Sequence, residues 1–329
     1  MYFDQSTKIY VAGHRGLAGS AICRELAKQR YQNIITRTHQ ELDLEDQQKT
    51  EEFICDTKPD VVFLAAAKVG GIHANNTYPV DFLMSNLAIQ SNVIKASHKA
   101  NVQRLIFLGS SCIYPKNCPQ PIKEEYLLTS ELEPTNRPYA LAKIAGIEMC
   151  WSYNRQFNTQ YLAAMPTNLY GPNDNYDLEN SHVLPVLMRK IHEAKISNLP
   201  HVEIWGSGKP KREFLHADDL ASALIYLINL NHDQFRELTK SDKAPLINIG
   251  TGSDQSIIDL ADLIKDIAGF DGDFKLNSSK PDGTLRKVLN VEKINKLGWS
   301  SKINLKEGIT QTYQDYCHKR VSKNKIVVN

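Results

Sequence analysis

The chain has 329 residues, and 42% of them are hydrophobic, which is enough for one large core or two modest ones. Its 39 basic and 37 acidic residues give a formal net charge of +2, which excludes a broad surface for nucleic acid or other polyanions. No apolar run approaches the roughly 20 residues that cross a bilayer, no signal peptide is evident, and the six cysteines form no C-x-x-C pair, so we expect a cytoplasmic protein with reduced thiols.

The first predicted elements are a strand, a glycine turn and a helix. Lys8–Ala12 is a short apolar strand, and the glycine turn from Gly13 to Gly19 follows it at once. An amphipathic helix then carries Ile22, Leu26 and Ala27 on one side. Glycines let the backbone approach a pyrophosphate, and a helix N-terminus offers unpaired N–H groups. This order predicts a dinucleotide site, although the glycine spacing differs from G-x-G-x-x-G. Glycines in an ordinary turn are the alternative.

The second predicted strand, Asn33–Arg37, bears on the choice of cofactor. An NAD site usually presents an acid to the ribose at this point. This chain presents Arg37 instead, together with Arg15 in the glycine turn. Two guanidinium groups suit a 2′-phosphate, so we expect NADP(H) rather than NAD. Solvated surface arginines are the alternative.

Alternating strands and helices continue to about residue 170. Asp60–Ala67 and Arg104–Gly109 are apolar runs typical of strands buried in a parallel sheet, and Gln160–Met165 is a further strand. Between them, the helix predicted over Asp81–Ala100 is apolar around much of its circumference, which predicts contacts with the sheet and with a partner subunit. The pattern predicts an α/β fold with a doubly wound parallel sheet of the Rossmann type.

A serine and a tyrosine–lysine pair follow the fourth strand. Tyr139 and Lys143 are four residues apart on a predicted helix, so their side chains share one face. We expect the cation to favour phenolate and to lower a phenol pKa that is about 10 in water. Ser110 can bond to the same substrate oxygen. The set predicts proton transfer to or from a carbonyl or alcohol. The tyrosine–lysine spacing alone often arises by chance, and the preceding nucleotide site gives it weight.

The pattern changes after residue 170. We expect the following elements there: a helix over Val183–Ala194, short strands over Val202–Trp205 and Lys211–His216 around a glycine turn, a helix after Asp218 and a strand over Leu246–Gly250. We therefore predict an NADP-binding Rossmann domain over residues 1–170, with returning segments around 216–252. Residues 171–329 would mainly form a smaller, mixed substrate-binding domain.

Longer motifs identify a family. The glycine turn, Ser110 and the Tyr139–Lys143 pair resemble the extended short-chain dehydrogenases/reductases. Within that group, six segments resemble the GDP-L-fucose synthases, namely Ala12–Gly16, Leu64–Pro79, Gly109–Pro115, Met165–Pro172, Trp205–Gly208 and Arg212–His216. The likeness runs from about Lys8 to Tyr313. It implies an NADPH-dependent conversion of GDP-4-keto-6-deoxy-D-mannose to GDP-L-fucose, by inversion at C3 and C5 and reduction at C4. It also implies a homodimer.

The resemblance assigns roles to individual residues. The cofactor set is Gly13, His14, Arg15, Gly16, Leu17, Ala18, Gly19, Arg37, Leu108, Gly109, Ser110, Ser111, Lys143, Pro166, Thr167, Asn168, Leu169 and His182. The reductase set is Ser110, Tyr139 and Lys143, and the base and acid of the inversions are Cys112 and His182. The nucleotide-sugar set is Lys190, Trp205, Arg212 and Asp282, and no metal is expected. Three positions depart from the family pattern, because His39 and Lys190 stand where it often has arginine and Leu285 stands where it often has proline.

Two rival functions stay open from the sequence. The first is a sugar-nucleotide 4-epimerase or 4,6-dehydratase that recycles bound NAD, although dehydratases usually carry an Asp-Glu pair where this chain has Ser111 and Cys112. The second is a non-catalytic nucleotide sensor, although such proteins typically lose the tyrosine or the lysine. For single residues, the alternatives are a buried packing role for Cys112, a capping role for His182 and a core position for Trp205.

Overall fold

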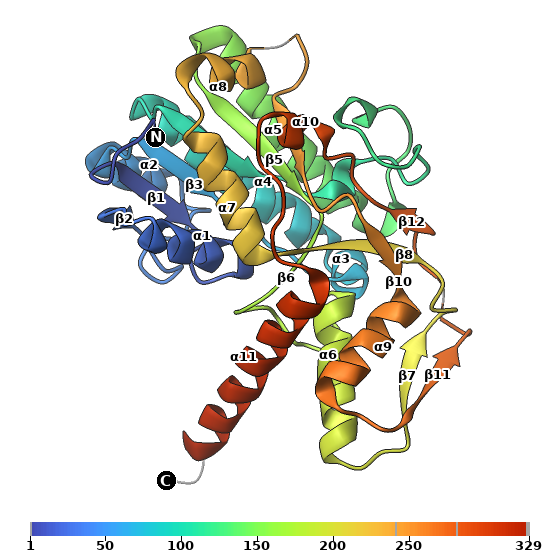
Figure 1. Ribbon diagram of the computed structural model, residues 1–329. Helices are drawn as coiled ribbons and strands as arrows, with labels where there is room; N and C mark the ends of the chain where they lie inside the picture. The colour runs from blue at the N-terminus through green and yellow to red at the C-terminus, as the bar shows by residue number, and fades with distance from the viewer. Residues whose placement is uncertain (1, 241, 281, 327–329) are drawn as a thin grey trace.

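The centre of the fold is a parallel sheet of six strands. The computed structural model describes residues 2–240, 242–280 and 282–326. The strand order is β2-β1-β3-β4-β5-β9, and every neighbouring pair is parallel (Figure 1). The strands are β1 (Lys8–Ala12), β2 (Asn33–Ile35), β3 (Val61–Leu64), β4 (Arg104–Leu108), β5 (Tyr161–Pro166) and β9 (Leu246–Ile249). The predicted α/β fold with a doubly wound sheet is confirmed.

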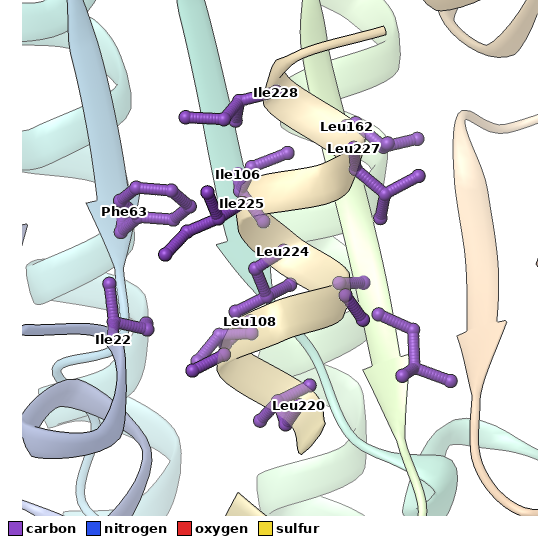
Figure 2. Packing of buried hydrophobic residues seen from close by; sticks show 14 of the residues in the cluster. Ile22, Phe63, Ile106, Leu108, Leu162, Leu220, Leu224, Ile225, Leu227 and Ile228 are labelled. Atoms are coloured by element: carbon purple, nitrogen blue, oxygen red, sulfur yellow. The ribbon is translucent and has the colours of Figure 1, made fainter. Parts of the chain in front are cut away.

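Helices cover both faces of this sheet. Successive side chains of a strand point to opposite faces, and in these strands both faces are apolar and must be buried. The two sets of helices are α1 (Leu17–Lys28), α7 (Ala217–Ile228) and α8 (His232–Thr239) on one face, and α2 (Gln47–Thr57), α4 (Pro79–Lys99) and α5 (Arg137–Phe157) on the other. Figure 2 shows the first face, where Leu224 and Ile225 of α7 lie over the strands near Phe63 and Ile106. Each such aliphatic side chain contributes about 1.5–3 kcal/mol when buried.

Three details of the first half differ from the sequence expectation. β2 ends at Ile35, because it pairs only with the first three residues of β1, and Arg37 therefore follows the strand. β3 covers Val61–Leu64 only, and its last residue pairs with the last residue of β1. Ala27 is exposed, since α1 buries a narrower stripe that includes Ile22 and Leu26.

The second half of the chain forms two small sheets and a helical layer. β6 (Asn168–Tyr170), β8 (Lys211–His216), β10 (Asp254–Ser256) and β12 (Arg286–Lys287) make one sheet, and β7 (His201–Trp205) and β11 (Asp273–Asn277) make the other. The expected strands around the glycine turn exist, but β7 and β8 belong to different sheets and do not pair with each other. The helices α6 (Val183–Ile196), α9 (Ile257–Ala268) and α11 (Leu305–Ile326) share a third apolar cluster with residues of these strands.

Short helices complete the fold. They are α3 (Ile72–Thr77), α10 (Glu292–Lys296), η1 (Ser111–Ile113), η2 (Glu124–Tyr126) and η3 (Pro134–Asn136). In the described part of the chain, no helix has the length and apolar character that crossing a membrane would require. The chain returns to the first sheet late, because β9 joins it beside β5 and α7 covers it (Figure 1). Residues far apart in sequence therefore meet at the carboxyl ends of the strands.

Candidate active site

The glycine turn after β1 is built for a close backbone approach. Gly13 has a φ of +85°, and a Cβ there would lie 2.7 Å from the backbone nitrogen of Ala66. A Cβ on Gly19 would overlap the carbonyl oxygen of Gly13. A Cβ on Gly16 would meet only ordinary contacts, so the protein itself does not require glycine at that point. Gly16 precedes α1, whose N-terminus has no side-chain cap. Unpaired N–H groups beside an open glycine fit a pyrophosphate.

The two expected arginines lie at the surface beside this turn. Arg15 and Arg37 are exposed, and the guanidinium of Arg37 lies 4.9 Å from the centre of the Phe53 ring. Sequence reasoning missed a third member, Glu41. Its carboxylate accepts a hydrogen bond from the backbone of Thr38 at 2.7 Å. Its pKa is lowered mainly by the bonds to Thr38, and the charges of Arg37 and Arg15 contribute. The charges of both arginines therefore reach one exposed carboxylate.

Ser110, Tyr139 and Lys143 come together at the carboxyl end of β4. Leu108 is the last residue of β4, and its carbonyl accepts a hydrogen bond from Nζ of Lys143 at 2.8 Å. Nζ lies 5.8 Å from the centre of the Tyr139 ring. The hydroxyl of Ser110 accepts from the backbone nitrogen of Cys112 at 3.2 Å and lies near enough to the Tyr139 phenol to oppose the rise that burial causes in its pKa. Gly109 and Ser111 continue this turn, in which Ser111 is buried.

The expected lowering of the Tyr139 pKa is wrong for this structure. Tyr139 is buried, and burial raises the pKa of its phenol above the ordinary value. Burial also lowers the pKa of Lys143 to about 7. An ammonium with that pKa is charged only about half of the time at neutral pH, so it gives the phenol little help. Sequence spacing predicts that the pair is adjacent but not that both groups are buried.

Cys112 and His182 face a third group that the sequence analysis did not identify. Nζ of Lys287, in β12, donates to Sγ of Cys112 at 3.5 Å. Cys112 also packs against the small cluster that contains Tyr139. His182 precedes α6, and its imidazole makes no capping hydrogen bond. Its side chain can still reach solvent, but the surrounding protein lowers its pKa, and the charge of Lys287 contributes. The thiol of Cys112 therefore lies beside Tyr139 and Lys287, and the charge of Lys287 reaches the imidazole of His182.

The glycine pair at residues 70 and 71 holds the loop that precedes His182. The backbone nitrogen of Gly71 donates to the carbonyl oxygen of Asn180 at 2.8 Å. A Cβ on Gly71 would lie 2.5 Å from the carbonyl oxygen of Ser181. Only glycine fits there without displacing the loop. The sequence identified this segment as a family motif, and the structure gives its physical reason.

The segment from Pro166 to Leu169 crosses between the sheets. It contains the end of β5 and the start of β6, and Thr167 is buried. The side chain of Asn168 donates to the carbonyl oxygen of Glu213 at 2.8 Å. The buried carboxylate of Glu213 accepts from the backbone of Thr251, Gly252 and Leu289 at 2.6, 2.7 and 2.8 Å. Burial raises its pKa, which the backbone bonds oppose. Glu213 thus joins the strands that carry the two halves of the site.

The expected nucleotide-sugar residues come from α6, the end of β7, β8 and the loop before β12, and Trp205 and Asp282 among them are exposed. The Trp205 side chain is 54% exposed, so a core position for it is wrong. Nζ of Lys190 and Nζ of Lys280 lie 5.2 and 5.1 Å from its ring centre, and Lys280 was not anticipated. Asp282 accepts from the backbone nitrogen and the hydroxyl of Ser207 at 2.8 and 2.7 Å. This group offers an aromatic face flanked by two cations.

Arg212 links this exposed group to the thiol. Its Nη1 donates to the carbonyl oxygens of Lys211 and Thr284. Burial lowers its pKa, which the nearby Cys112 and Asp282 oppose. The charge of Arg212 therefore lies within electrostatic reach of both Cys112 and Asp282.

Comparison with known proteins agrees with this arrangement. The model of the NAD dependent epimerase/dehydratase family matches residues 9–238. The chain is 53% identical over 320 residues to the putative GDP-L-fucose synthase 2 of Arabidopsis thaliana, with 97% of this chain and 94% of that protein covered. It is 50% identical over 307 residues to the GDP-L-fucose synthase of Escherichia coli K12, with 93% and 95% covered.

Solved structures give the same result. The GDP-mannoheptose C4 reductase from Campylobacter jejuni with NADP bound is 41% identical and superposes with a TM-score of 0.88, with 96% of this chain and 99% of that chain covered. The GDP-L-fucose synthetase from Naegleria fowleri bound to NADP is 26% identical, with a TM-score of 0.85 and 97% of both chains covered. The chain therefore belongs to the NAD dependent epimerase/dehydratase family.

Proposed function

We propose that this enzyme converts GDP-4-keto-6-deoxy-D-mannose to GDP-L-fucose with NADPH as the reductant. One observation carries the proposal. Tyr139 packs beside Cys112, and Lys143 donates to the carbonyl oxygen of Leu108 at the end of β4. Lys287 donates to Cys112, and its charge reaches His182, which supports a shared site for the reductase and epimerase residues. Relatives at 50–53% identity bear the corresponding name. Tyr139, Lys143 and Cys112 are all present, and a non-catalytic sensor would typically have lost the tyrosine or the lysine.

The residues around the glycine turn fit NADP(H). Gly13 and Gly19 allow the turn to pack tightly, Gly16 leaves the backbone open to a pyrophosphate, and α1 points its N-terminus at the same turn. Arg15 and Arg37 would hold the 2′-phosphate, and the segment from Pro166 to Leu169 would lie beside the nicotinamide. NADPH supplies the hydride for the reduction when it is bound. Solved relatives with NADP support this assignment.

The inversions use the acidity of carbons beside a ketone. C3 and C5 both flank C4, so loss of a proton from either gives an enolate. Cys112 would take that proton as thiolate, and His182 would return one from the opposite face as imidazolium. Ser110 and Tyr139 would donate hydrogen bonds to the enolate oxygen, which stabilises its charge. The exposed edge of His182 leaves it accessible to a sugar in the cleft.

Reduction at C4 uses the same oxygen. Tyr139 would give its proton to the C4 oxygen as the carbon is reduced, and its raised pKa keeps that proton in place until then. Lys143 would favour the phenolate formed only in its protonated fraction, which burial reduces. Because one ketone activates C3 and C5 and is itself reduced, a single cleft serves both activities.

The second half of the chain would bind the GDP part of the substrate. Trp205 between Lys190 and Lys280 suits a base or a diphosphate, and Arg212 extends this positive surface toward Cys112. We accordingly assign residues 1–170, with the return around 216–252, to cofactor binding. We assign residues 171–329 mainly to substrate binding.

We also propose a cytoplasmic homodimer. Val80 and Met84, one turn apart on α4, are 68% and 57% exposed, and Leu141 on α5 is 40% exposed. These apolar side chains suit a second copy of the same two helices. The six cysteines are all free, which suits a reducing compartment. Light scattering that gives one-chain mass at micromolar concentration would refute the dimer.

The function is tested by mixing the protein with NADPH and GDP-4-keto-6-deoxy-D-mannose. The account predicts one NADPH oxidised for each sugar converted, with GDP-L-fucose as the product identified by NMR. Conversion without net NADPH loss would identify a recycling 4-epimerase or dehydratase. A 6-deoxyhexose reduced at C4 but not inverted would identify a simple C4 reductase.

A further inference from the structure

Lys287 lies beside Cys112 and within electrostatic reach of His182, the two groups that would handle protons at carbon. Its Nζ is 3.5 Å from Sγ of Cys112. Its charge also reaches the imidazole of His182, whose pKa it helps to lower. β12, which carries the lysine, pairs with β8, and the next turn of chain is fixed by the bond from Leu289 to Glu213. Ordered backbone contacts therefore hold the ammonium beside the thiol.

Cys112 and Lys287 also line one small polar cavity of about 40 Å³. Glu133 and Asn136 form part of its wall. Oδ1 of Asn136 is buried without a hydrogen-bond partner among the described residues. A cavity of this volume with several polar groups suits one or two water molecules. Hydrogens on Lys287 can then exchange with solvent.

Two successive inversions require Cys112 and His182 to regain their starting protonation states after the first inversion. In one inversion the Cys112 thiolate takes a proton from carbon, and the His182 imidazolium gives a proton to carbon. The site is left with a neutral thiol and a neutral imidazole. Before the second carbon can be inverted, one proton must leave the sulfur and one must reach the imidazole.

We propose that Lys287 resets this pair between the two inversions, an inference that rests on the proposed function. The ammonium of Lys287 gives a proton to the imidazole of His182, and the amine so formed takes the proton of the Cys112 thiol. One N–H bond of the lysine breaks and one forms, so the lysine ends unchanged. The net change is one proton moved from sulfur to the imidazole nitrogen. Arginine in the same place would keep the charge but not release a proton.

The test compares deuterium uptake at C3 and C5 in deuterated water for the parent protein, Lys287→Arg and Lys287→Met. With arginine, the carbon inverted first exchanges at nearly the parent rate, and the other slows by about 10² or more, as expected for lost acid–base catalysis. With methionine, the charge beside Cys112 is lost as well, so both carbons slow and the second slows more. Lys116→Arg, the same change at an exposed lysine of the same cavity, leaves both rates unchanged.

The two carbons make the outcome decisive. If Lys287 acts only through its charge, Lys287→Arg exchanges both carbons in the parent ratio, and the relay is refuted. Equal loss at both carbons in Lys287→Arg refutes it too. A singly inverted, reduced sugar accumulating from Lys287→Arg supports it. If the parent protein exchanges neither carbon, the proposed function itself fails, and the relay fails with it.

Discussion

Charge at single residues decides which cofactor binds. Arg15 and Arg37 face outward beside the glycine turn, and Glu41 lies near both. If both arginines bind the 2′-phosphate as proposed, the negative charge of Glu41 is expected to reduce the gain from that phosphate. His39 stands where the family often has arginine, so this position adds no third guanidinium group. The side chain is exposed, and its Nδ1 lies 3.7 Å from Oδ1 of Asp43.

Arg37→Ala is therefore expected to weaken NADPH binding about tenfold and to leave NADH binding nearly unchanged, since one charge-assisted contact contributes about 1.5–3 kcal/mol. Glu41→Gln is expected to strengthen NADPH binding, because it removes the competing carboxylate. Titration of both cofactors by fluorescence checks this. Equal losses for NADPH and NADH in Arg37→Ala would rule out a 2′-phosphate contact.

Burial of Lys143 gives the protein a pH-dependent stability. The pKa of Lys143 is about 7 in the folded protein, against an ordinary value of 10.5. Between those pH values the unfolded chain binds the extra proton, so this lysine makes the free energy of unfolding rise with pH. The contribution changes by at most about 1.4 kcal/mol per pH unit.

Lys143→Met removes this titration. The free energy of unfolding of the variant, minus that of the parent, is expected to be largest near pH 7 and to fall steadily toward pH 10. Urea unfolding at pH 7, 8 and 9 measures the difference in slope, and loss of the bond to Leu108 adds only a constant. Parallel pH profiles for the two proteins would show that Lys143 is not buried as a neutral amine.

Loops that dock on one another set the geometry of the epimerase pair. Gly71 bonds the loop that ends at His182, and a side chain at Gly71 would push on Ser181. Gly71→Ala is expected to slow deuterium exchange at C3 and C5 by about 10²-fold, because an ångström of misplacement can cost that much. NADPH binding should be unchanged. Val69→Ala, at an exposed neighbour, serves as the control. Normal exchange in Gly71→Ala would mean that this loop does not position His182.

Local elements were predictable, and their partners were not. The glycine turn and the Tyr139–Lys143 pair follow from residues close together in sequence, and the structure brings each set together. Lys287 and Cys112 are separated by 175 positions, and no spacing rule connects them. β7 and β8 were expected around a shared turn but took other partners, because strand pairing depends on the rest of the sheet.

The opposite end of the sheet makes the same point. Arg104 is fully buried at the amino end of β4. Its Cζ lies 3.9 Å from the centre of the Tyr2 ring and 4.1 Å from the centre of the Phe235 ring. Its Nη1 donates to the carbonyl oxygens of Ile228 and Leu230. The sequence suggests only the start of a strand there. The structure shows a cation that fastens the chain after α7 to the sheet, at the end opposite the site.

At the scale of the whole molecule, the proposed function brings epimerisation and reduction to one ketone of the substrate. The turn after β4 supplies Ser110, and α5 supplies Tyr139. The residue before α6 is His182, and β12 supplies Lys287. Glu213 connects these parts through its backbone and its carboxylate. If this account is correct, the two activities share one cleft but use separable proton-transfer groups.

Cys112→Ala and Tyr139→Phe test that separation most directly. In deuterated water with GDP-4-keto-6-deoxy-D-mannose and NADPH, Cys112→Ala should lose exchange at C3 and C5, yet slowly reduce the uninverted sugar to a 6-deoxyhexose other than fucose. Tyr139→Phe should keep at least part of the exchange and lose about 10² to 10⁴ in NADPH oxidation. A folded Cys112→Ala protein that takes up deuterium normally at both carbons and still makes GDP-L-fucose would contradict the account.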